Sequence, residues 1–397
     1  MLYPFLAAQY SEKNRSRIDQ LAASDLDTVE HIWGGNDHSL SFRHVLVGTP
    51  GQRSETWQAW LHSGEIEYSF EPKYYVLRQQ QNWGSVQIDR WAVFGAVSLK
   101  DSRLFIHEDV IPEGVERARL GQEFCEGDLS PIFVGCEENA GRRLRFLLQQ
   151  NFANKEPTLR FRESNQSQHF LWPVESESIT RELAEIFWEA PLFLLDGHHR
   201  LAAAQRNDRS GIGDGKILAC VCSMEPLDLA ILPIHRTAFC ERWILPDVLV
   251  DDLQRLGCKV RELNSYKPTS LPTALQQMDP NELSCFFLHA HSDRVFRLDL
   301  PKSISLPPPL AGLPVAVLDN EVLKKCADCR VIPETNLRLA MEHLAQDQAQ
   351  VGFFLPAPNA DQVRKIASQN LRMPRKSTRF VPKLALGLII RPWENSG

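Results

Sequence analysis

The stretch LLDGHHRLAAAQ, residues Leu194 to Gln205, joins a short apolar run to a series of helix formers through a turn. The run before the turn, LFLL, is apolar throughout and predicts a buried strand, while the alanines after Arg200 predict a helix. Gly197 allows the backbone to turn sharply between the two. The stretch therefore predicts a strand-turn-helix unit whose turn carries a carboxylate, two histidines and an arginine.

The segments on either side of this unit continue the alternation of helices and strands. A capped amphipathic helix is expected to begin after Ser176 or Ser178 and to end before Pro191. The stretches KILACVCS (216–223) and DLAILPIHR (228–236) predict strands. Helix, strand, turn, helix and strand in this order predict an α/β (α+β) fold.

The length of 397 residues is sufficient for two domains. We expect a first domain over residues 1–245 and a second α/β domain over 246–397. In the second domain we expect a helix near Pro246–Leu256, a strand near Cys285–Leu288, a helix over Ala360–Gln369 and a final apolar strand, LALGLII (384–390).

Composition restricts the class of protein. The 44 Lys and Arg residues against 50 Asp and Glu give a formal charge of −6, which argues against a general nucleic-acid-binding surface. The N-terminus has no basic leader and no run reaches the length of a membrane span, so a cytoplasmic protein without a membrane partner is expected. Nine scattered cysteines fit a reducing compartment, and the isolated C-x-x-C pair, Cys326 and Cys329, is interpreted as ordinary reduced thiols.

The turn itself supports three interpretations. Gly197, the start of a helix and the planar fork of Arg200 are typical of a phosphate site, to which His198 and His199 could add donors. Alternatively, Asp196 and one histidine, joined by His107 or His235, could bind a metal ion. In the third interpretation, Asp196 caps the helix and the histidines are hydrogen-bonded turn residues. The residues alone leave all three open.

Five ordered blocks, together with the signature DGHHR (Asp196 to Arg200), resemble a bacterial and archaeal family of unknown function. The five blocks are PFLAAQY (4–10), IHEDV (106–110), DLSPIF (128–133), LPIHR (232–236) and MPRKSTRFVPKLALGL (373–388). The DGHHR block is also similar to the phosphate-binding motif of the ParB/sulfiredoxin fold, which includes free serine kinases. The resemblance implies a ParB/sulfiredoxin-like mixed-sheet core that binds ATP or ADP. Because the turn lacks the cysteine of sulfiredoxin, peroxiredoxin repair is not expected.

The resemblance further implies a kinase or phosphotransferase that acts on a small hydroxylated metabolite. Gly197, His198, His199 and Arg200 would hold the nucleotide phosphates, and His199 would also take part in catalysis. Asp196 would bind Mg²⁺ or orient the acceptor hydroxyl, and Glu108 would be the general base. The remaining residues implied to contact the ligands are His107, His235, Arg236, Lys376, Ser377, Thr378 and Lys383.

The chain departs from the family pattern at several positions. Gln9 stands where the family usually has arginine, Val110 where it commonly has threonine, and Asp128 where it has asparagine. These changes favour either a different acceptor or a nucleotide-binding regulatory protein without catalysis. A metal-dependent hydrolase that uses Asp196 and the histidines is the third hypothesis.

Overall fold

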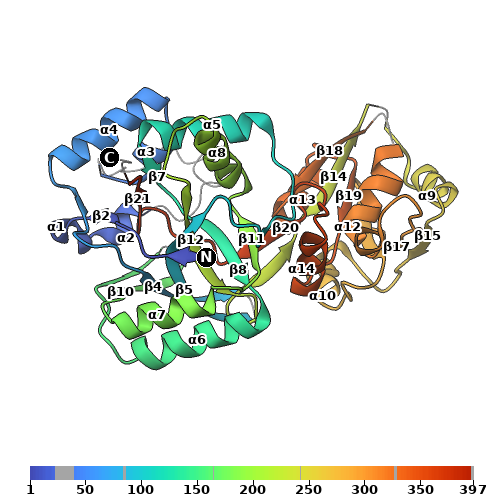
Figure 1. Cartoon of the computed structure of the whole chain (residues 1–397). Helices are drawn as coiled ribbons and strands as arrows, with labels where there is room; N and C mark the ends of the chain where they lie inside the picture. Colours follow the sequence, from blue (N-terminus) through green and yellow to red (C-terminus); the bar gives the residue numbers. More distant parts are fainter. Residues whose placement is uncertain (23–39, 84–85, 164, 242, 326–328, 395–397) are drawn as a thin grey trace. The chain divides into compact units, whose positions relative to one another are not determined.

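A computed structural model describes residues 1–22, 40–83, 86–163, 165–241, 243–325 and 329–394. The chain forms two compact units (Figure 1). Unit 1 comprises Met1–Ile106, Val110–Ala230 and Pro382–Gly397, and unit 2 comprises His107–Asp109 and Ile231–Val381. The division lies at residue 230 rather than at the expected 245. The reason is that β14 (His235–Cys240) pairs with strands of unit 2, while β21 (Arg391–Pro392) returns to pair with β7 (Gly127–Asp128) of unit 1.

The described part of unit 1 contains a mixed sheet of nine strands, in the order β6-β11-β8-β12-β5-β4-β10-β9, with β1 beside β5. The pairs β6–β11 and β8–β12 are parallel and the other pairs are antiparallel. The strands are β1 (Leu2–Tyr3), β4 (Tyr75–Trp83), β5 (Val86–Ser98), β6 (Leu104–Phe105), β8 (Ile132–Cys136), β9 (Leu159–Arg162), β10 (Gln168–Pro173), β11 (Leu192–Asp196) and β12 (Lys216–Ser223). This arrangement confirms the predicted α/β (α+β) class with a mixed-sheet core.

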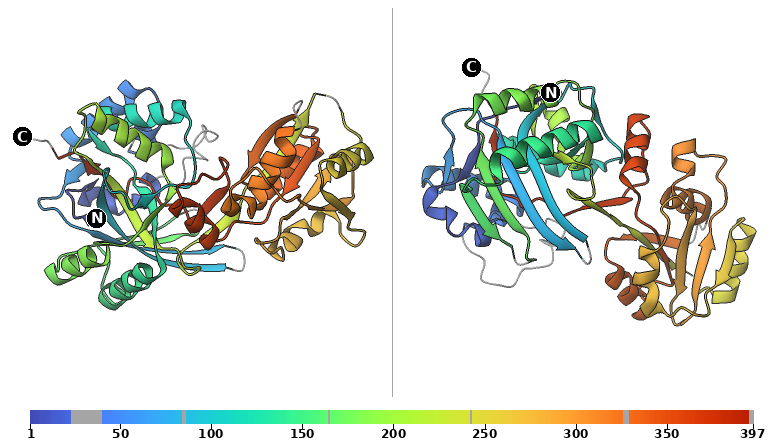
Figure 2. Two further views of the ribbon diagram at one scale, coloured as in Figure 1. Left: turned by 45° about the vertical axis from the view of Figure 1, so that its right-hand side comes forward. Right: turned by 90° about the horizontal axis from the view of Figure 1, so that it is seen from below.

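Helices cover both faces of this sheet. Figures 1 and 2 show α6 (Glu138–Phe152) and α7 (Glu177–Ile186) side by side on one face, and Figure 1 shows α5 (Pro112–Phe124) and α8 (His198–Arg209) together on the other. Ser176 begins α7, as expected, because its hydroxyl accepts a hydrogen bond from the Ile179 N–H. The smaller elements are α1 (Glu12–Arg15), α2 (Ile18–Leu21), α3 (Arg43–Leu46), α4 (Pro50–His62) and the pair β2 (Ala8–Tyr10) and β3 (Ile66–Tyr68).

Unit 2 contains, within its described residues, a sheet of six strands in the order β15-β17-β16-β19-β14-β18. Besides β14, its strands are β15 (Lys259–Glu262), β16 (Ser284–His289), β17 (Val295–Asp299), β18 (Cys329–Glu334) and β19 (Val351–Phe354). A separate pair consists of β13 (Ala230–Pro233) and β20 (Thr378–Val381). The helices are α9 (Pro246–Arg255), α10 (Leu271–Gln276), α11 (Pro308–Ala311), α12 (Pro314–Val317), α13 (Leu337–Ala345) and α14 (Ala360–Ser368), with short turns η2 (Pro268–Ser270), η3 (Leu318–Val322) and η4 (Leu323–Lys325). Among the described helices, none has the length and apolar character needed to cross a membrane.

Two local expectations were wrong. The segment LALGLII is buried, but it is irregular apart from isolated bridges, because Gly387 adopts a left-handed φ of 86° beside the ring of Phe42. Cys329 is not a reduced thiol: it forms a disulfide with Cys240, its direct partner across β14 and β18. Cys326, the other half of the C-x-x-C pair, lies outside the described residues.

Candidate functional site

The turn between β11 and α8 has the predicted form. Four buried apolar residues precede Asp196, and Gly197 then takes a left-handed φ of 94° before the helix begins at His198. A Cβ at Gly197 would lie 2.9 Å from Ile132 Cγ2 and 3.1 Å from Arg200 Nε. Both the backbone conformation and the close approach therefore require glycine.

Asp196 is contacted by two cations. Its Oδ2 lies 2.7 Å from Lys383 Nζ, and its Oδ1 lies 3.9 Å from Arg200 Nη2 and accepts the Gly197 N–H at 2.7 Å. Burial opposes ionisation, but the two cations prevail and hold the pKa of Asp196 well below its usual range. Lys383 and Arg200 thus place two cations at the N-terminal end of α8, where an anion is favoured.

Arg200 is anchored through part of its guanidinium. Nη1 donates to Ser130 Oγ at 3.1 Å and also to the carbonyl oxygen of Pro131, just before β8. Burial lowers the pKa of Arg200, and the nearby carboxylates of Asp196 and Asp128 oppose this effect. Hydrogen bonds to Ser130 and Pro131 thus hold the guanidinium beside Gly197.

His199 faces helix α5. Its Nε2 accepts a hydrogen bond from the Ile111 N–H at 3.1 Å, and the ring lies so close to Gly114 that a Cβ there would be 2.5 Å from it. This nitrogen is therefore an acceptor, and the phosphate-binding and catalytic roles of His199 stay predictions. His198, the first residue of α8, is half-buried.

Lys383 is positioned by two buried polar residues that the sequence reasoning missed. Gln79 Nε2 donates to the Lys383 carbonyl oxygen at 2.8 Å, and Arg90 Nη1 donates to Gln79 Oε1 at 2.9 Å and to the Pro382 carbonyl oxygen at 2.8 Å. Gln79 and Arg90 are direct partners across β4 and β5, and both are fully buried. The sequence carried no distinct signal for them, because Gln79 is one of three successive glutamines in β4 (YVLRQQQNW) and Arg90 follows the charged Asp89 in β5 (VQIDRWAVFGAVS).

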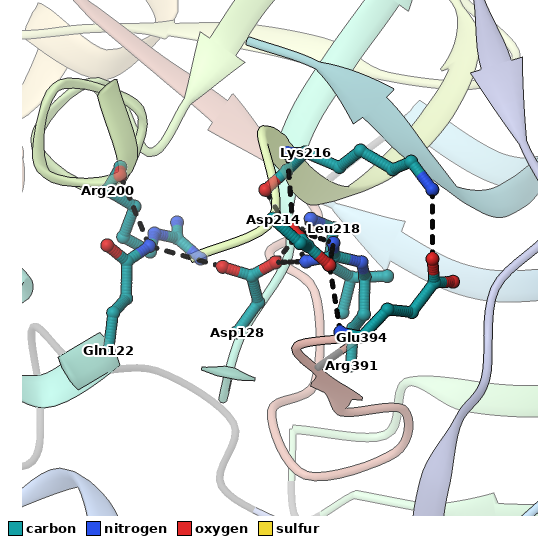
Figure 3. Close-up of polar contacts among 8 residues, drawn as sticks. All are labelled: Gln122, Asp128, Arg200, Asp214, Lys216, Leu218, Arg391 and Glu394. Carbon is teal, nitrogen blue, oxygen red and sulfur yellow. Dashed lines mark hydrogen bonds and ion pairs between the residues drawn. The ribbon is translucent and has the colours of Figure 1, made fainter. Parts of the chain in front are cut away.

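A buried ionic cluster connects the C-terminal segment to this turn (Figure 3). Arg391 pairs with Asp128 at 2.7 Å and with Asp214, and Asp128 Oδ2 also accepts the Leu218 N–H. Gln122 Nε2 donates to Asp128 Oδ1 at 3.2 Å and to the Arg200 carbonyl oxygen at 3.3 Å. The cluster therefore links β7, β12 and β21 to the first turn of α8.

The other predicted site residues gather in unit 2 around the MPRKST segment. Glu108 Oε1 accepts the Lys376 N–H at 2.9 Å, and Arg236 Nη1 donates to the Lys376 carbonyl oxygen at 3.0 Å while its Nη2 pairs with Asp319 at 3.0 Å. Lys376 has a left-handed φ of 56°, which is uncommon for a residue with a side chain. Glu108 and Arg236 thus hold the backbone of Lys376 from both sides.

Four further predicted residues of unit 2 have mainly internal contacts. His107 Nε2 lies 3.1 Å from Thr378 Oγ1, and the buried Ser377 hydroxyl donates to the Pro374 carbonyl oxygen. His235 Nδ1 accepts the Leu355 N–H at 3.2 Å. Burial, assisted by Arg236, lowers the pKa of His235 to about 4, so this ring is neutral at pH 7.

The structure therefore brings the predicted residues together in two groups. Within unit 1, Lys383 joins the turn Asp196–Arg200, and within unit 2, His107, Glu108 and Arg236 join Lys376–Thr378. The catalytic and ligand-binding roles assigned to these residues stay predictions. Among the described residues, no three His, Cys, Asp or Glu side chains are grouped so that they could hold a metal ion.

Comparison with known proteins identifies the family. A family model described as "Protein of unknown function (DUF1015)" matches residues 3–320. The chain therefore belongs to this family, which confirms the resemblance noted from the five sequence blocks. No curated protein matches the chain.

Several solved structures show a distant similarity to the chain. A free serine kinase in complex with AMP is 13% identical, with a TM-score of 0.40 over 76% of this chain and 91% of that one. SbnI from Staphylococcus aureus, with a C-terminal truncation, is 12% identical, with a TM-score of 0.41 over 75% and 87%. A conserved hypothetical protein from Pyrococcus furiosus is 11% identical, with a TM-score of 0.39 over 78% and 97%. At these values the similarity carries no inference about activity.

Proposed function

We propose that unit 1 binds the phosphate groups of ATP or ADP at the turn Asp196–Arg200 and that the protein is a phosphotransferase for a small hydroxylated metabolite. The observation that carries the proposal is the pairing of one carboxylate, Asp196, with two cations, Lys383 and Arg200, at the start of α8. The two cations and the first N–H groups of the helix together favour a polyanion.

Each residue of the turn has a distinct part in this proposal. Gly197 lets the phosphates approach the backbone, and Lys383 and Arg200 neutralise their charge. Lys383 would exchange part of its contact with Asp196 for a phosphate oxygen, which would leave the carboxylate available to a Mg²⁺ ion that arrives with the nucleotide. Transfer would then move one phosphoryl group from the nucleotide to the acceptor hydroxyl, which loses its proton to a base.

Nucleotide binding can be tested with a matched pair of lysine variants. Lys383→Met removes the cation at Asp196, whereas Lys73→Met removes a lysine of the same unit that also lies 2.7 Å from a carboxylate, that of Glu175, at similar exposure. Calorimetric titration with ATP, ADP and AMP should show at least tenfold weaker binding by Lys383→Met and unchanged binding by Lys73→Met. Equal binding by both variants would exclude this turn as the nucleotide site.

Transfer is tested separately. The wild-type protein is incubated with ATP or ADP, Mg²⁺ and a panel of hydroxylated metabolites beginning with L-serine, and phosphorus NMR detects the shortened nucleotide and a new phosphate ester. Nucleotide binding without any such product would support the alternative, a non-catalytic nucleotide-binding regulatory protein.

A further inference from the structure

A cavity of about 470 Å³ in unit 2 is lined by residues that belong to neither group described above. These residues are Trp243, Pro246, His289, Ala290, His291 and Asp347. The volume is within the range of small-molecule sites. The chemistry of its lining differs from that of a phosphate site, because no Lys or Arg is among these described residues.

The indole of Trp243 is half-exposed, whereas the backbone of the next residue, Ile244, contacts two buried polar side chains. The Ile244 N–H donates to Gln350 Oε1 at 3.3 Å, and the Ile244 carbonyl oxygen lies 2.6 Å from His289 Nε2. Gln350 Nε2 also donates to the Cys240 carbonyl oxygen at 2.7 Å. Gln350 and His289 are both 3% exposed, whereas Trp243 is 48% exposed. Buried polar groups thus fix the segment that presents a large aromatic surface at the cavity.

Aromatic rings surround this part of the cavity. The Trp243 ring centroid lies 5.4 Å from that of His289, nearly perpendicular to it, and 5.7 Å from that of His291. The two nitrogens of His289 face the carbonyl oxygens of Ile244 and Ala290, each at 2.6 Å. His289 therefore directs its polar atoms at the backbone, and the exposed part of the Trp243 indole is the aromatic surface available to a ligand.

The acidic group of the lining is the carboxylate of Asp347. Asp347 forms an ion pair with His291, which is charged only when protonated, and both side chains are more than half exposed. His291 and Asp347 each have a left-handed φ of 58°, so the backbone places both residues in a conformation that side chains rarely favour. A carboxylate beside an exposed indole is the combination that attracts an organic cation.

We propose that this cavity binds an organic ammonium ion, with its alkylated nitrogen over the Trp243 indole and its charge balanced by Asp347. The positive ligand would replace His291 as the partner of the carboxylate. This site is independent of the proposed nucleotide site, and its lining disfavours phosphate-bearing ligands.

Choline and its uncharged analogue 3,3-dimethylbutan-1-ol provide a matched pair of probes for the full-length protein. Calorimetric titration and the change in tryptophan fluorescence should show binding of choline at least about tenfold tighter than that of the alcohol, a difference of ~1.4 kcal/mol. Trp243→Leu and Asp347→Asn should each abolish or reduce this preference. Trp188→Leu, which removes an indole 58% exposed in unit 1, should leave it unchanged.

The outcomes separate the possibilities. Equal binding of choline and the alcohol would show an apolar cavity and overturn the assignment of a cation. No binding of either probe to the folded wild-type protein would overturn the site itself. Choline binding that survives both Trp243→Leu and Asp347→Asn would place the cation elsewhere. Circular dichroism of each variant confirms that loss of binding is not loss of fold.

Discussion

The guanidinium Nη1 of Arg90 donates a hydrogen bond to the carbonyl oxygen of Pro382 over 2.8 Å, across 292 positions of the sequence. The same nitrogen also donates to Gln79, whose amide in turn donates to the carbonyl oxygen of Lys383. Two successive carbonyl groups of the C-terminal segment are therefore fixed by one strand pair in the core. This attachment directs the Lys383 side chain to Asp196.

We expect Gln79→Leu to weaken nucleotide binding by about 3- to 10-fold, because the backbone of Lys383 loses its donor. The free energy of unfolding should fall by about 1–3 kcal/mol, since Arg90 and the Lys383 carbonyl each lose a buried partner. Calorimetric titration and urea unfolding measure the two effects.

Gln81→Leu is the control, because Gln81 is a buried glutamine two residues further along the same strand. Gln79→Glu separates positioning from folding: it keeps an acceptor for Arg90 but removes the donor to Lys383. If Gln79→Glu binds nucleotide as the wild type does, Gln79 has no part in positioning Lys383.

Gly197→Ala should destabilise the protein more than Gly211→Ala. Both glycines have a left-handed φ, of 94° and 74°, so both substitutions incur the backbone cost of about 1 kcal/mol. Only the Cβ at Gly197 also meets Ile132 and Arg200, whereas that at Gly211 meets nothing within 4 Å. We expect an additional loss of about 1–3 kcal/mol at Gly197, from overpacking.

Thermal unfolding monitored by circular dichroism provides the comparison. Equal losses for the two alanine variants would mean that Ile132 and Arg200 move aside without cost, and that the close approach at Gly197 does not constrain the turn.

The strand-turn-helix unit was predictable because its determinants lie within one short segment. Buried leucines, Gly197 and the helix formers after Arg200 act through neighbouring residues, and local patterns report such interactions well. The partners of Asp196 and Arg200 come from distant segments, Lys383 and Ser130–Pro131. Helical or strand periodicity in the sequence does not indicate such contacts. Lys383 was identified only through the family resemblance.

The failures have equally specific causes. The apolar composition of LALGLII predicted a strand, but the left-handed Gly387 interrupts the segment, and it forms only isolated bridges, such as that of Ile390 with Ala8, rather than a continuous ladder. The compact units divide at residue 230 and not at the expected 245, because β14 is paired with strands nearly one hundred residues later, and pairing partners determine the unit to which a strand belongs.

Because Cys240 and Cys329 form a disulfide, we expect the unfolded protein to show two fewer titratable thiols before reduction than after it. Because it closes a separation of 89 residues, its removal should lower the free energy of unfolding by about 2–5 kcal/mol. Cys329→Ser measured in urea, with and without dithiothreitol, gives this value. Dithiothreitol should then destabilise the wild type but leave Cys329→Ser unchanged, and an equal thiol count before and after reduction would contradict the bond.

Arg391→Met should destabilise unit 1 by about 3–5 kcal/mol at pH 7, because Asp128 and Asp214 would lose their buried cation. Burial already raises the pKa of Asp128 in spite of Arg391. Without the arginine this pKa should rise further, so the folded variant binds a proton more tightly than the unfolded chain does. Its stability must then fall as the pH rises above about 4, the pKa of an exposed aspartate, and the loss relative to the wild type should be smaller at pH 5 than at pH 7.

Urea unfolding at both pH values measures this difference, and the double variant Asp128→Asn with Arg391→Met should show a weaker pH dependence than Arg391→Met alone. A loss in Arg391→Met that is the same at pH 5 and pH 7 would show that protonation of Asp128 does not compensate for the missing arginine.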